Sequence, residues 1–191
     1  MTDRYLALHP NEASRLAALV DLLDAGGDVA SRRHMPGHLT ASALIVDPEA
    51  ADGPAVLLIH HKGLGKWLQP GGHLDPGEVP IDAARREAAE EVGLTDLVLH
   101  PWHAAHGGAP IDVDIHPIPA NPKKGEPTHF HHDFRYLFLV PPGGAPGNVR
   151  LAVDEVAGHR WAPLNGPNLP DDLDLALSKV RDAMGGSRDP F

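Results

Sequence analysis

Three glutamates stand close together in the segment "ARREAAEEV", and their spacing can place them on one side of a helix. Glu87, Glu90 and Glu91 occupy positions i, i+3 and i+4, which fall within roughly one 100° stripe of a helical surface. Like charges at this spacing destabilise a helix unless something neutralises them. Arg86 can pair with Glu90, but one guanidinium does not neutralise three acids. Carboxylate oxygens suit Mg²⁺ or Mn²⁺, which would hold a diphosphate against the helix.

The stretch "LQPGGHLDPGE", residues 68–78, comes shortly before this acidic helix and is crowded with turn-forming residues. Gly71 and Gly72 allow the backbone to approach a neighbouring group closely, because glycine has no Cβ. Pro76 and Gly77 then turn the chain toward the helix. We therefore expect a loop that holds its backbone against the acids. The alternative is an ordinary turn beside a solvated acidic helix face.

The spacing of loop and helix resembles the Nudix box, a glycine, five residues, a glutamate, seven residues, then Arg-Glu-aliphatic-x-Glu-Glu-x-Gly-aliphatic. The matching positions are Gly72, Glu78, Arg86, Glu87, Glu90, Glu91, Gly93 and Leu94. Ala88 departs from the pattern, since the family usually has a larger aliphatic residue there, and we expect it to face the core. The resemblance implies an α+β fold, the Nudix α/β/α sandwich with a mixed β-sheet.

The resemblance also implies an activity and a set of roles. Nudix enzymes use Mg²⁺ or Mn²⁺ to hydrolyse a diphosphate linkage in a nucleoside diphosphate derivative, with water attacking phosphorus. By similarity, the metal ligands would be Glu87, Glu90, Glu91 and the backbone carbonyl of Gly71. Glu90, or an acid outside the box, would activate the water. Arg86 would orient a box glutamate, and Glu78 would brace the loop against the helix.

The acid or base outside the box is not fixed by the resemblance. The candidates are Glu126, His131 and Asp133, and we favour Asp133 because it lies on a strong strand whose polar face could point into the site. The alternative is a surface aspartate on a half-exposed strand. Arg135 lies on the same face of that strand and is a candidate for substrate binding.

Further substrate contacts are predicted from His73, Trp67 and His131. His73 follows Gly72 directly, and Trp67 ends a loop at the expected mouth of the cleft, where it either stacks on a base or packs in the core. Histidines 129, 131 and 132, with His116, could instead form an imidazole site for Zn or Fe. Histidines on strands are also common as surface or hydrogen-bonded core groups.

The elements that must position these residues follow from hydrophobic periodicity. Helices are predicted over residues 11–24, 80–92 and 170–184, and strands over 38–47, 54–61, 94–102, 110–118, 128–140 and 158–164. Many strands with few helices favour a mixed sheet covered by helices rather than regular βαβ units. We expect an N-terminal helical extension over residues 1–36, the catalytic domain over 37–184, and a mobile tail over 185–191.

Composition limits the partners. The 191 residues carry a net charge of -10, which opposes non-specific binding to nucleic acid or to anionic membranes. There is no cysteine, which excludes disulfides and thiolate metal sites. No signal peptide or membrane-length apolar run is evident, so we expect a cytoplasmic protein acting on a small molecule. The N-terminal helix could mediate a homodimer.

Two other functions remain open at this stage. The chain could be a Nudix domain that senses a nucleotide derivative without turning it over, although the complete set of box acids opposes this. It could also be a metalloprotein built on the histidines of residues 116–133.

Overall fold

The computed structural model describes residues 1–122, 125–144 and 148–186. Its architecture is built around β1 (Gly37–Asp47), a strand buried along its whole length. β1 runs parallel to β7 (His129–Leu139) over ten paired positions. Its other edge is shared, because β4 (Gly71–His73) pairs with its first half and β2 (Ala55–His61) with its last residues. The sheet is therefore mixed, as predicted.

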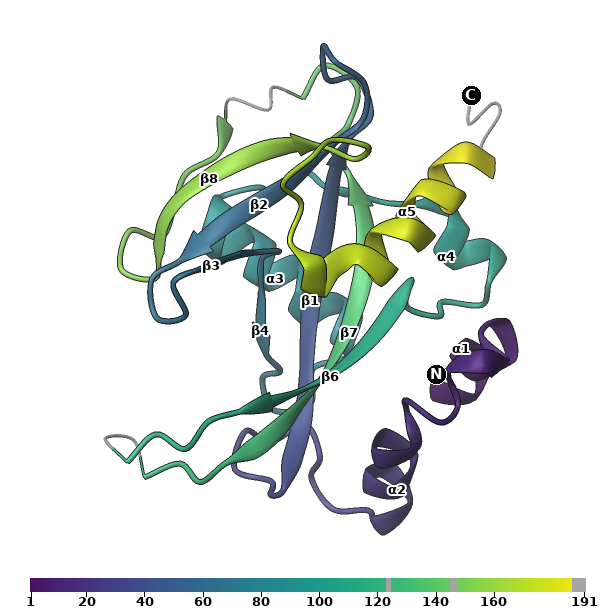
Figure 1. Ribbon diagram of the computed structural model, residues 1–191, viewed down its shortest axis with the longest axis vertical. Coiled ribbons are helices and arrows are strands. Elements are labelled where there is room, and N and C mark those ends of the chain that lie inside the picture. Colours follow the sequence, from purple (N-terminus) through teal and green to yellow (C-terminus); the bar gives the residue numbers. More distant parts are fainter. Residues whose placement is uncertain (123–124, 145–147, 187–191) are drawn as a thin grey trace.

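The remaining strands extend this frame on both sides (Figure 1). β3 (Lys66–Leu68) and β8 (Val156–Pro163) both pair with β2. β5 (Val98–Leu99) and β6 (Asp112–Ile118) both pair with β7. Within the described residues the sheet has eight strands, and β4 joins it by pairing with the N-terminal half of β1.

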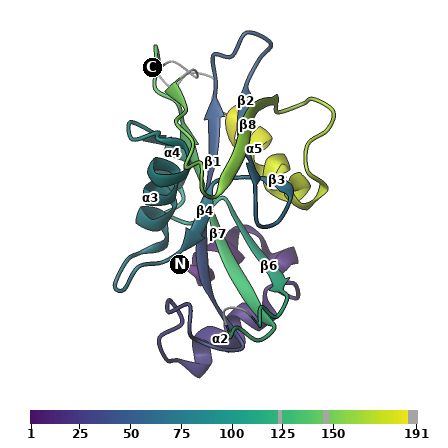
Figure 2. The ribbon, with the colours of Figure 1, turned by 90° about the vertical axis from the view of Figure 1, so that its left-hand side faces the viewer.

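Helices cover both faces of the sheet, which gives the expected α/β/α sandwich. Figure 2 shows α3 (Pro80–Val92) and α5 (Asp174–Gly186) on opposite sides of the strands. The core on the α3 side combines aliphatic side chains with small and aromatic ones, which include Ala41, Ala43, Ala83, Ala84, Ala88, Phe134, Tyr136 and Phe138. The α5 side is aliphatic and includes Leu44, Val46, Leu137, Leu177 and Val180. Ala88 is fully buried, as predicted.

Sequence signals at its two ends set the bounds of α3, and these bounds agree with the prediction. Pro80 occupies the first turn, where a missing N–H costs nothing. Gly93 ends the helix in the left-handed conformation, with φ of 70°, and its amide bonds the carbonyl of Ala89. The buried alanines bring the helix close to the sheet.

The N-terminal segment differs from its prediction. It contains α1 (Thr2–Leu8), a 3-10 turn at Pro10–Glu12 and α2 (Ala17–Ala25) instead of one helix from residue 11. Residues between the turn and α2 are held by Arg15, whose guanidinium pairs with Glu12. The tyrosine of α1, Tyr5, is fully buried and joins the core.

Three further differences concern short elements. The strand predicted over 94–102 is limited to β5, because Pro101 begins α4 (Pro101–Ala105) and the side chain of His100 caps it. The C-terminal helix starts with a 3-10 turn at Asp171–Leu173 before α5. The last residues of the predicted mobile tail, 187–191, lie outside the described residues. Within the described part of the chain, none of the helices has the length and apolar character needed to cross a bilayer.

Candidate active site

The glycine-rich loop reaches α3 through β4. The register pairs Gly71 with Ser42 and Gly72 with Ala41, so the two glycines lie on the edge of β1. The amide of Gly71 donates a 2.9 Å hydrogen bond to the carboxylate of Glu91. A Cβ at Gly71 would lie 2.8 Å from the carbonyl oxygen of Ala41, and one at Gly72 would overlap the carboxylate of Glu87. Both positions therefore require glycine for this close approach.

Arg86 connects the loop to the helix. Its guanidinium donates to both carboxylate oxygens of Glu78, at 3.1 and 3.0 Å, and to the backbone carbonyl of His73 at 2.8 Å. The same group donates to Glu87 at 2.9 Å and to Glu90 at 3.1 Å. Glu78 also accepts the amide of Asp75 at 2.9 Å. Loop 73–78 is thus closed by Glu78 and joined by one arginine to two of the helix acids.

The three helix acids differ in burial. Glu91 is 3% exposed, and burial first, then the nearby Glu87, raises its pKa to about 7, against the opposing effect of the Gly71 amide. Burial also raises the pKa of Glu87, although Arg86 opposes this. Glu90 is largely exposed.

These carboxylates fit a divalent cation by the chemistry of the donor set. Negative charge is concentrated on one helix face, and Arg86 is the cation that pairs with Glu87 and Glu90 in the described part of the chain. Burial is the main cause of the raised pKa of Glu91, and the charges of Glu87, Glu155 and Glu90 add to it. Hard oxygen donors are those that Mg²⁺ and Mn²⁺ prefer.

One acid near the box was missed by the sequence analysis. The segment before β8 docks on the end of α3, with the amide of Arg150 bonding the carbonyl of Val92 and that of Ala152 bonding Glu91. This brings the exposed Glu155 near enough that its charge contributes to the raised pKa of Glu87 and of Glu91. No local sequence pattern indicates that Glu155 lies near the acids of α3, because more than 60 residues separate it from the helix.

Asp133 lies on the other face of the sheet. The alternation of β7 places Phe134 toward α3 and Asp133 away from it. Asp133 is 2% exposed and accepts hydrogen bonds from Ser42 at 2.8 Å and Thr40 at 3.1 Å. Arg135 donates to it at 3.2 Å. The alternative of a surface aspartate on a half-exposed strand is therefore wrong, because both faces of the strand are covered here.

Arg135 is equally enclosed. Besides Asp133, its guanidinium pairs with Asp112 at 3.1 Å and with Asp114 at 3.2 Å, both on β6. Arg135 is 5% exposed, so its donors serve these carboxylates rather than a ligand. The network continues to Lys179 of α5, which lies 2.7 Å from Asp112.

Several histidines share this second face of the sheet. His131 lies beside His38 of β1, with ring centroids 4.8 Å apart, and beside His73 of β4 at 5.0 Å. His129 packs on the same group, 5.2 Å from His131, as the strand alternation predicts. Burial lowers the pKa of His73 to about 4 and also lowers that of His38. These two imidazoles are neutral at physiological pH.

Two predicted residues lie elsewhere. Glu126 pairs with Arg32 at 2.9 Å, at the far end of the β6–β7 hairpin. His132 points to the face opposite His131, where a Cβ at Gly37 would lie 2.9 Å from its Nε2. The lysines of the same hairpin, 123 and 124, lie outside the described residues.

Trp67 is part of β3 rather than of a flexible loop. Its ring packs partly buried against the α5-side core, with His60 at 5.2 Å and the guanidinium of Arg160 at 4.7 Å. It lines a 410 Å³ pocket together with Arg160, Leu169 and Asp172. Trp67 therefore packs against the core, which is one of its two predicted positions, while part of its ring stays accessible to solvent.

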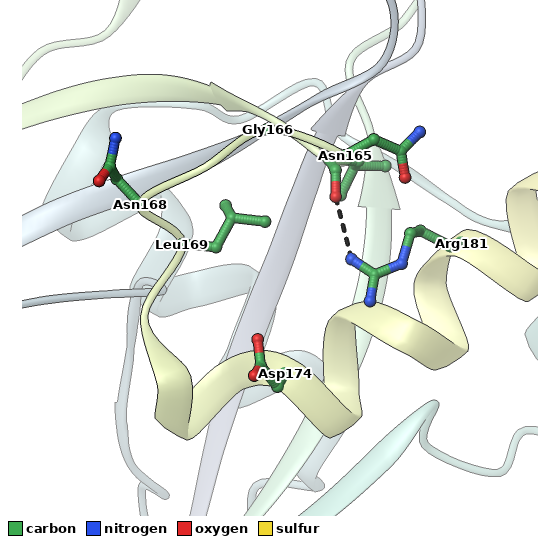
Figure 3. Close-up of a pocket in the computed structure, with 7 residues that line it drawn as sticks. Asn165, Gly166, Asn168, Leu169, Asp174 and Arg181 are labelled. Carbon is green, nitrogen blue, oxygen red and sulfur yellow. Dashed lines mark hydrogen bonds between the residues drawn. The ribbon is translucent and has the colours of Figure 1, made fainter.

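An adjoining pocket of 380 Å³ lies between the segment that follows β8, residues 164–169, and α5 (Figure 3). Arg181 of α5 crosses it and donates to the carbonyl of Leu164 at 2.9 Å. Asn168 and Leu169 line both pockets. Neither pocket includes the α3 acids, so neither marks the site of the proposed chemistry.

Comparison with known proteins decides the family. The family model described as NUDIX domain matches residues 36–183, which include the loop, α3 and every strand. This chain belongs to the NUDIX domain family. The match also confirms the expectation of an enzyme of the Nudix hydrolase type.

Relatives of this NUDIX domain carry several activities. The "Probable DHNTP pyrophosphohydrolase" of Lactococcus lactis subsp. cremoris is 32% identical over 124 residues, covering 64% of this chain and 67% of that protein. An "Isopentenyl-diphosphate Delta-isomerase" of Streptomyces griseus is 28% identical, covering 90% of this chain and 89% of that protein. These names show that the NUDIX relatives of this chain do not share one reaction.

Solved structures support the fold. The binary complex of the Caenorhabditis elegans Ap4A hydrolase has a TM-score of 0.57 at 21% identity, covering 78% of this chain and 98% of that one. The Nudix hydrolase RenU of Mycobacterium smegmatis has a TM-score of 0.53 at 21% identity, covering 80% and 89%. At these identities the likeness shows the fold alone.

Proposed function

We propose that this NUDIX domain hydrolyses a diphosphate linkage in a nucleoside diphosphate derivative, with Mg²⁺ or Mn²⁺ as cofactor. The observation that carries the proposal is the joining of the glycine-rich loop to α3, through Arg86 and through the Gly71–Glu91 hydrogen bond. These contacts place the three carboxylates of α3 beside the backbone of Gly71 and Gly72, which carries no side chains. The substrate class is supported by the relatives named "Probable DHNTP pyrophosphohydrolase" and, in Mus musculus, "Bis(5'-nucleosyl)-tetraphosphatase [asymmetrical]", the second 37% identical over 73 residues.

The residues that would hold the cation are Glu87, Glu90 and Glu91, with the carbonyl of Gly71 as a backbone ligand. A bound divalent cation neutralises charge on the phosphates and makes bound water more acidic. Other side chains of the protein hold these ligands in position. Arg86 holds Glu87 and Glu90 in place, and Glu78 keeps loop 73–78 closed against the helix.

The proton of the attacking water needs an acceptor on the α3 side. We assign this role to Glu90 or Glu155, which are both exposed on that side. Asp133 is not assigned, because it is buried on the other face and already accepts from Ser42, Thr40 and Arg135. Phosphoryl transfer depends mainly on charge stabilisation and positioning, so the acceptor contributes less than the cation site.

The substrate would extend beyond the diphosphate along the sheet. His73 follows the box glycine directly, and Trp67 presents part of its ring beside a pocket. We propose His73, His131 and Trp67 as the residues that meet the group attached to the diphosphate, which must then pass from α3 to the opposite face of the sheet, where these side chains lie.

The test is a panel of nucleoside diphosphate derivatives that includes sugar nucleotides, dinucleoside polyphosphates and nucleoside triphosphates, each with Mg²⁺ or Mn²⁺. Products are identified by mass in ¹⁸O-labelled water, so that the label reports the phosphorus attacked. We expect hydrolysis of at least one compound and its loss on addition of a chelator. No turnover across the panel would refute the proposal, and tight binding without turnover would indicate a sensing domain instead.

Matched variants separate the two candidate acceptors. Glu90→Gln and Glu155→Gln are compared with Glu49→Gln, an exposed glutamate in the turn after β1. We expect the acceptor variant to lose about 100-fold in rate, measured at saturating Mg²⁺ because Glu90 is also a proposed cation ligand, and the control to retain the wild-type rate. Equal rates in all three variants would exclude both acids as the acceptor.

A further inference from the structure

Three histidines from three different strands converge on the face of the sheet opposite α3. They are His38 of β1, His73 of β4 and His131 of β7. Each offers a ring nitrogen, and the three nitrogens all lie within 4.8 Å of one another. Among the described residues, no other group of three or more His, Cys, Asp or Glu side chains brings its ligand atoms this close together. The box glutamates do not meet this distance criterion.

His38 provides a second and independent indication of a ligand. Its side chain is 1% exposed, and its Nδ1 lies 3.3 Å from the carbonyl of His34. That contact leaves Nε2 without the proton and available as an electron-pair donor. Nε2 is buried and has no hydrogen-bond partner. Buried polar atoms are seldom left unpaired, and an ion within the cluster would satisfy this one.

Two further histidines pack against the rings of the cluster. His116 lies edge-on to His131, with ring centroids 5.5 Å apart, and its Nδ1 is 2.9 Å from Asp114. His129 stacks on His38 at 5.0 Å, and its Nδ1 bonds the carbonyl of Pro127 at 2.8 Å. Among the three proposed ligands, His38 has the kind of carbonyl partner that fixes ring orientation at metal sites, because its Nδ1 lies 3.3 Å from the carbonyl of His34.

The cluster is separate from the box acids. Gly72 faces Glu87, so the alternation along β4 directs the side chain of His73 to the opposite face. The backbone carbonyl of His73 accepts from Arg86. The two sites therefore lie on either side of one short strand. They also differ in chemistry, because imidazole donors suit Zn²⁺ and related transition metals, whereas carboxylates suit Mg²⁺.

We propose that His38, His73 and His131 bind one transition-metal ion of the Zn²⁺ class, at a site distinct from the carboxylate site on α3. Three protein nitrogens leave at least one coordination position open, as in zinc sites that bind an exogenous oxygen ligand. The site uses none of the box acids. Zinc affinity can therefore be measured apart from hydrolysis, although His73 and His131 are also the proposed contacts of the group attached to the diphosphate.

The test measures zinc affinity in the full chain. Protein stripped with a chelator is titrated with Zn²⁺ against a chromophoric competitor, and Co²⁺ is used as a spectroscopic probe of coordination. His73→Asn and His131→Asn are the principal variants, since both side chains are only partly buried and their loss leaves the backbone contact with Arg86 intact. The controls are His159→Asn, an exposed histidine of β8, and Glu91→Gln of the box. Circular dichroism checks that each variant is folded.

We expect wild type to bind about one equivalent of Zn²⁺, with a Co²⁺ spectrum typical of tetrahedral nitrogen ligation. Each cluster variant should weaken Zn²⁺ binding by at least about 100-fold, while both controls keep the wild-type affinity. The proposal is overturned if wild type binds no zinc, or if the cluster variants bind as tightly as wild type. Loss of binding in Glu91→Gln with retention in His73→Asn would also overturn it.

Discussion

The amide of Gly71 donates a 2.9 Å hydrogen bond to the carboxylate of Glu91. This contact joins a strand at the edge of β1 to the inner face of α3, across 20 residues of sequence. It fixes the buried glutamate in one position and presents the loop backbone to the helix acids. The proposed cation site depends on this arrangement, because the ligands come from both sides of the contact.

The first prediction concerns Gly72. In Gly72→Ala, the new methyl group would overlap the carboxylate of Glu87, so that side chain must move. We expect kcat/KM to fall by roughly 100-fold, since displacement of a ligand by about 1 Å is costly to catalysis. Steady-state kinetics on a substrate from the panel measures this. The control is Gly158→Ala, whose Cβ would meet no atom within 4 Å. A wild-type rate in Gly72→Ala would show that Glu87 has no role.

Gly71→Ala should act differently, through stability. Its Cβ would lie 2.8 Å from both the carbonyl oxygen of Ala41 and the Cα of Ser42, which are backbone atoms. Overpacking against backbone that cannot move aside destabilises by about 1–3 kcal/mol. Urea unfolding should therefore show a larger loss in the free energy of unfolding for Gly71→Ala than for Gly72→Ala. The reverse order would contradict the packing of β4 on β1.

Substitution of Asp133 tests whether this residue has a structural or a catalytic role. Asp133→Ala removes one of the three carboxylates that pair with the buried Arg135 and leaves Ser42 and Thr40 without their acceptor, and we expect a loss of about 1–3 kcal/mol in the free energy of unfolding. The rate per folded molecule should stay near that of wild type. Asp52→Ala, in an exposed turn, serves as the control for both measurements. A large loss of rate with unchanged stability would instead restore Asp133 as the catalytic base.

The N-terminal segment predicts a pH dependence of stability. Burial opposes ionisation of Glu12, but hydrogen bonds from Lys179, Tyr5 and Arg15 outweigh it and hold its pKa below the usual 4.5. A depressed pKa in the folded state stabilises the fold above the unfolded pKa, and this stability is lost as pH falls through the folded pKa. Below about pH 4.5, wild type should therefore lose stability faster than Glu12→Gln. Denaturant unfolding at a series of pH values gives the slope of the unfolding free energy against pH for wild type and for Glu12→Gln. Equal slopes would show that the fold does not lower the pKa of Glu12.

Local signals explain which parts of the molecule were predictable. The bounds of α3 follow from Pro80 and Gly93, and the two faces of β7 follow from strict alternation. The α4 helix was missed because an apolar run preceding Pro101 is typical of a strand as well as of a short buried loop. These are properties that neighbouring residues determine.

The groupings across the sheet were not predictable in the same way. The sequence analysis placed His131 with other histidines of its own hairpin, and it does lie beside His116 and His129. It did not predict His38 and His73, which the register of β1 and β4 brings to the same group. Glu155 reaches α3 through two backbone hydrogen bonds of the segment before β8. Such contacts depend on strand order and loop docking, which hydrophobic periodicity does not encode.

The central claim is that the α3 carboxylates carry the hydrolysis, and Glu91→Gln tests it most directly. Glutamine keeps an oxygen for the Gly71 amide and nearly the same shape, so the variant should fold, but it lacks the charge that would hold the cation. With Mg²⁺ present, we predict a hydrolysis rate about 100- to 1,000-fold below wild type, equivalent to several kcal/mol of lost transition-state stabilisation. Folded Glu91→Gln that hydrolyses the same substrate at the wild-type rate would contradict the account.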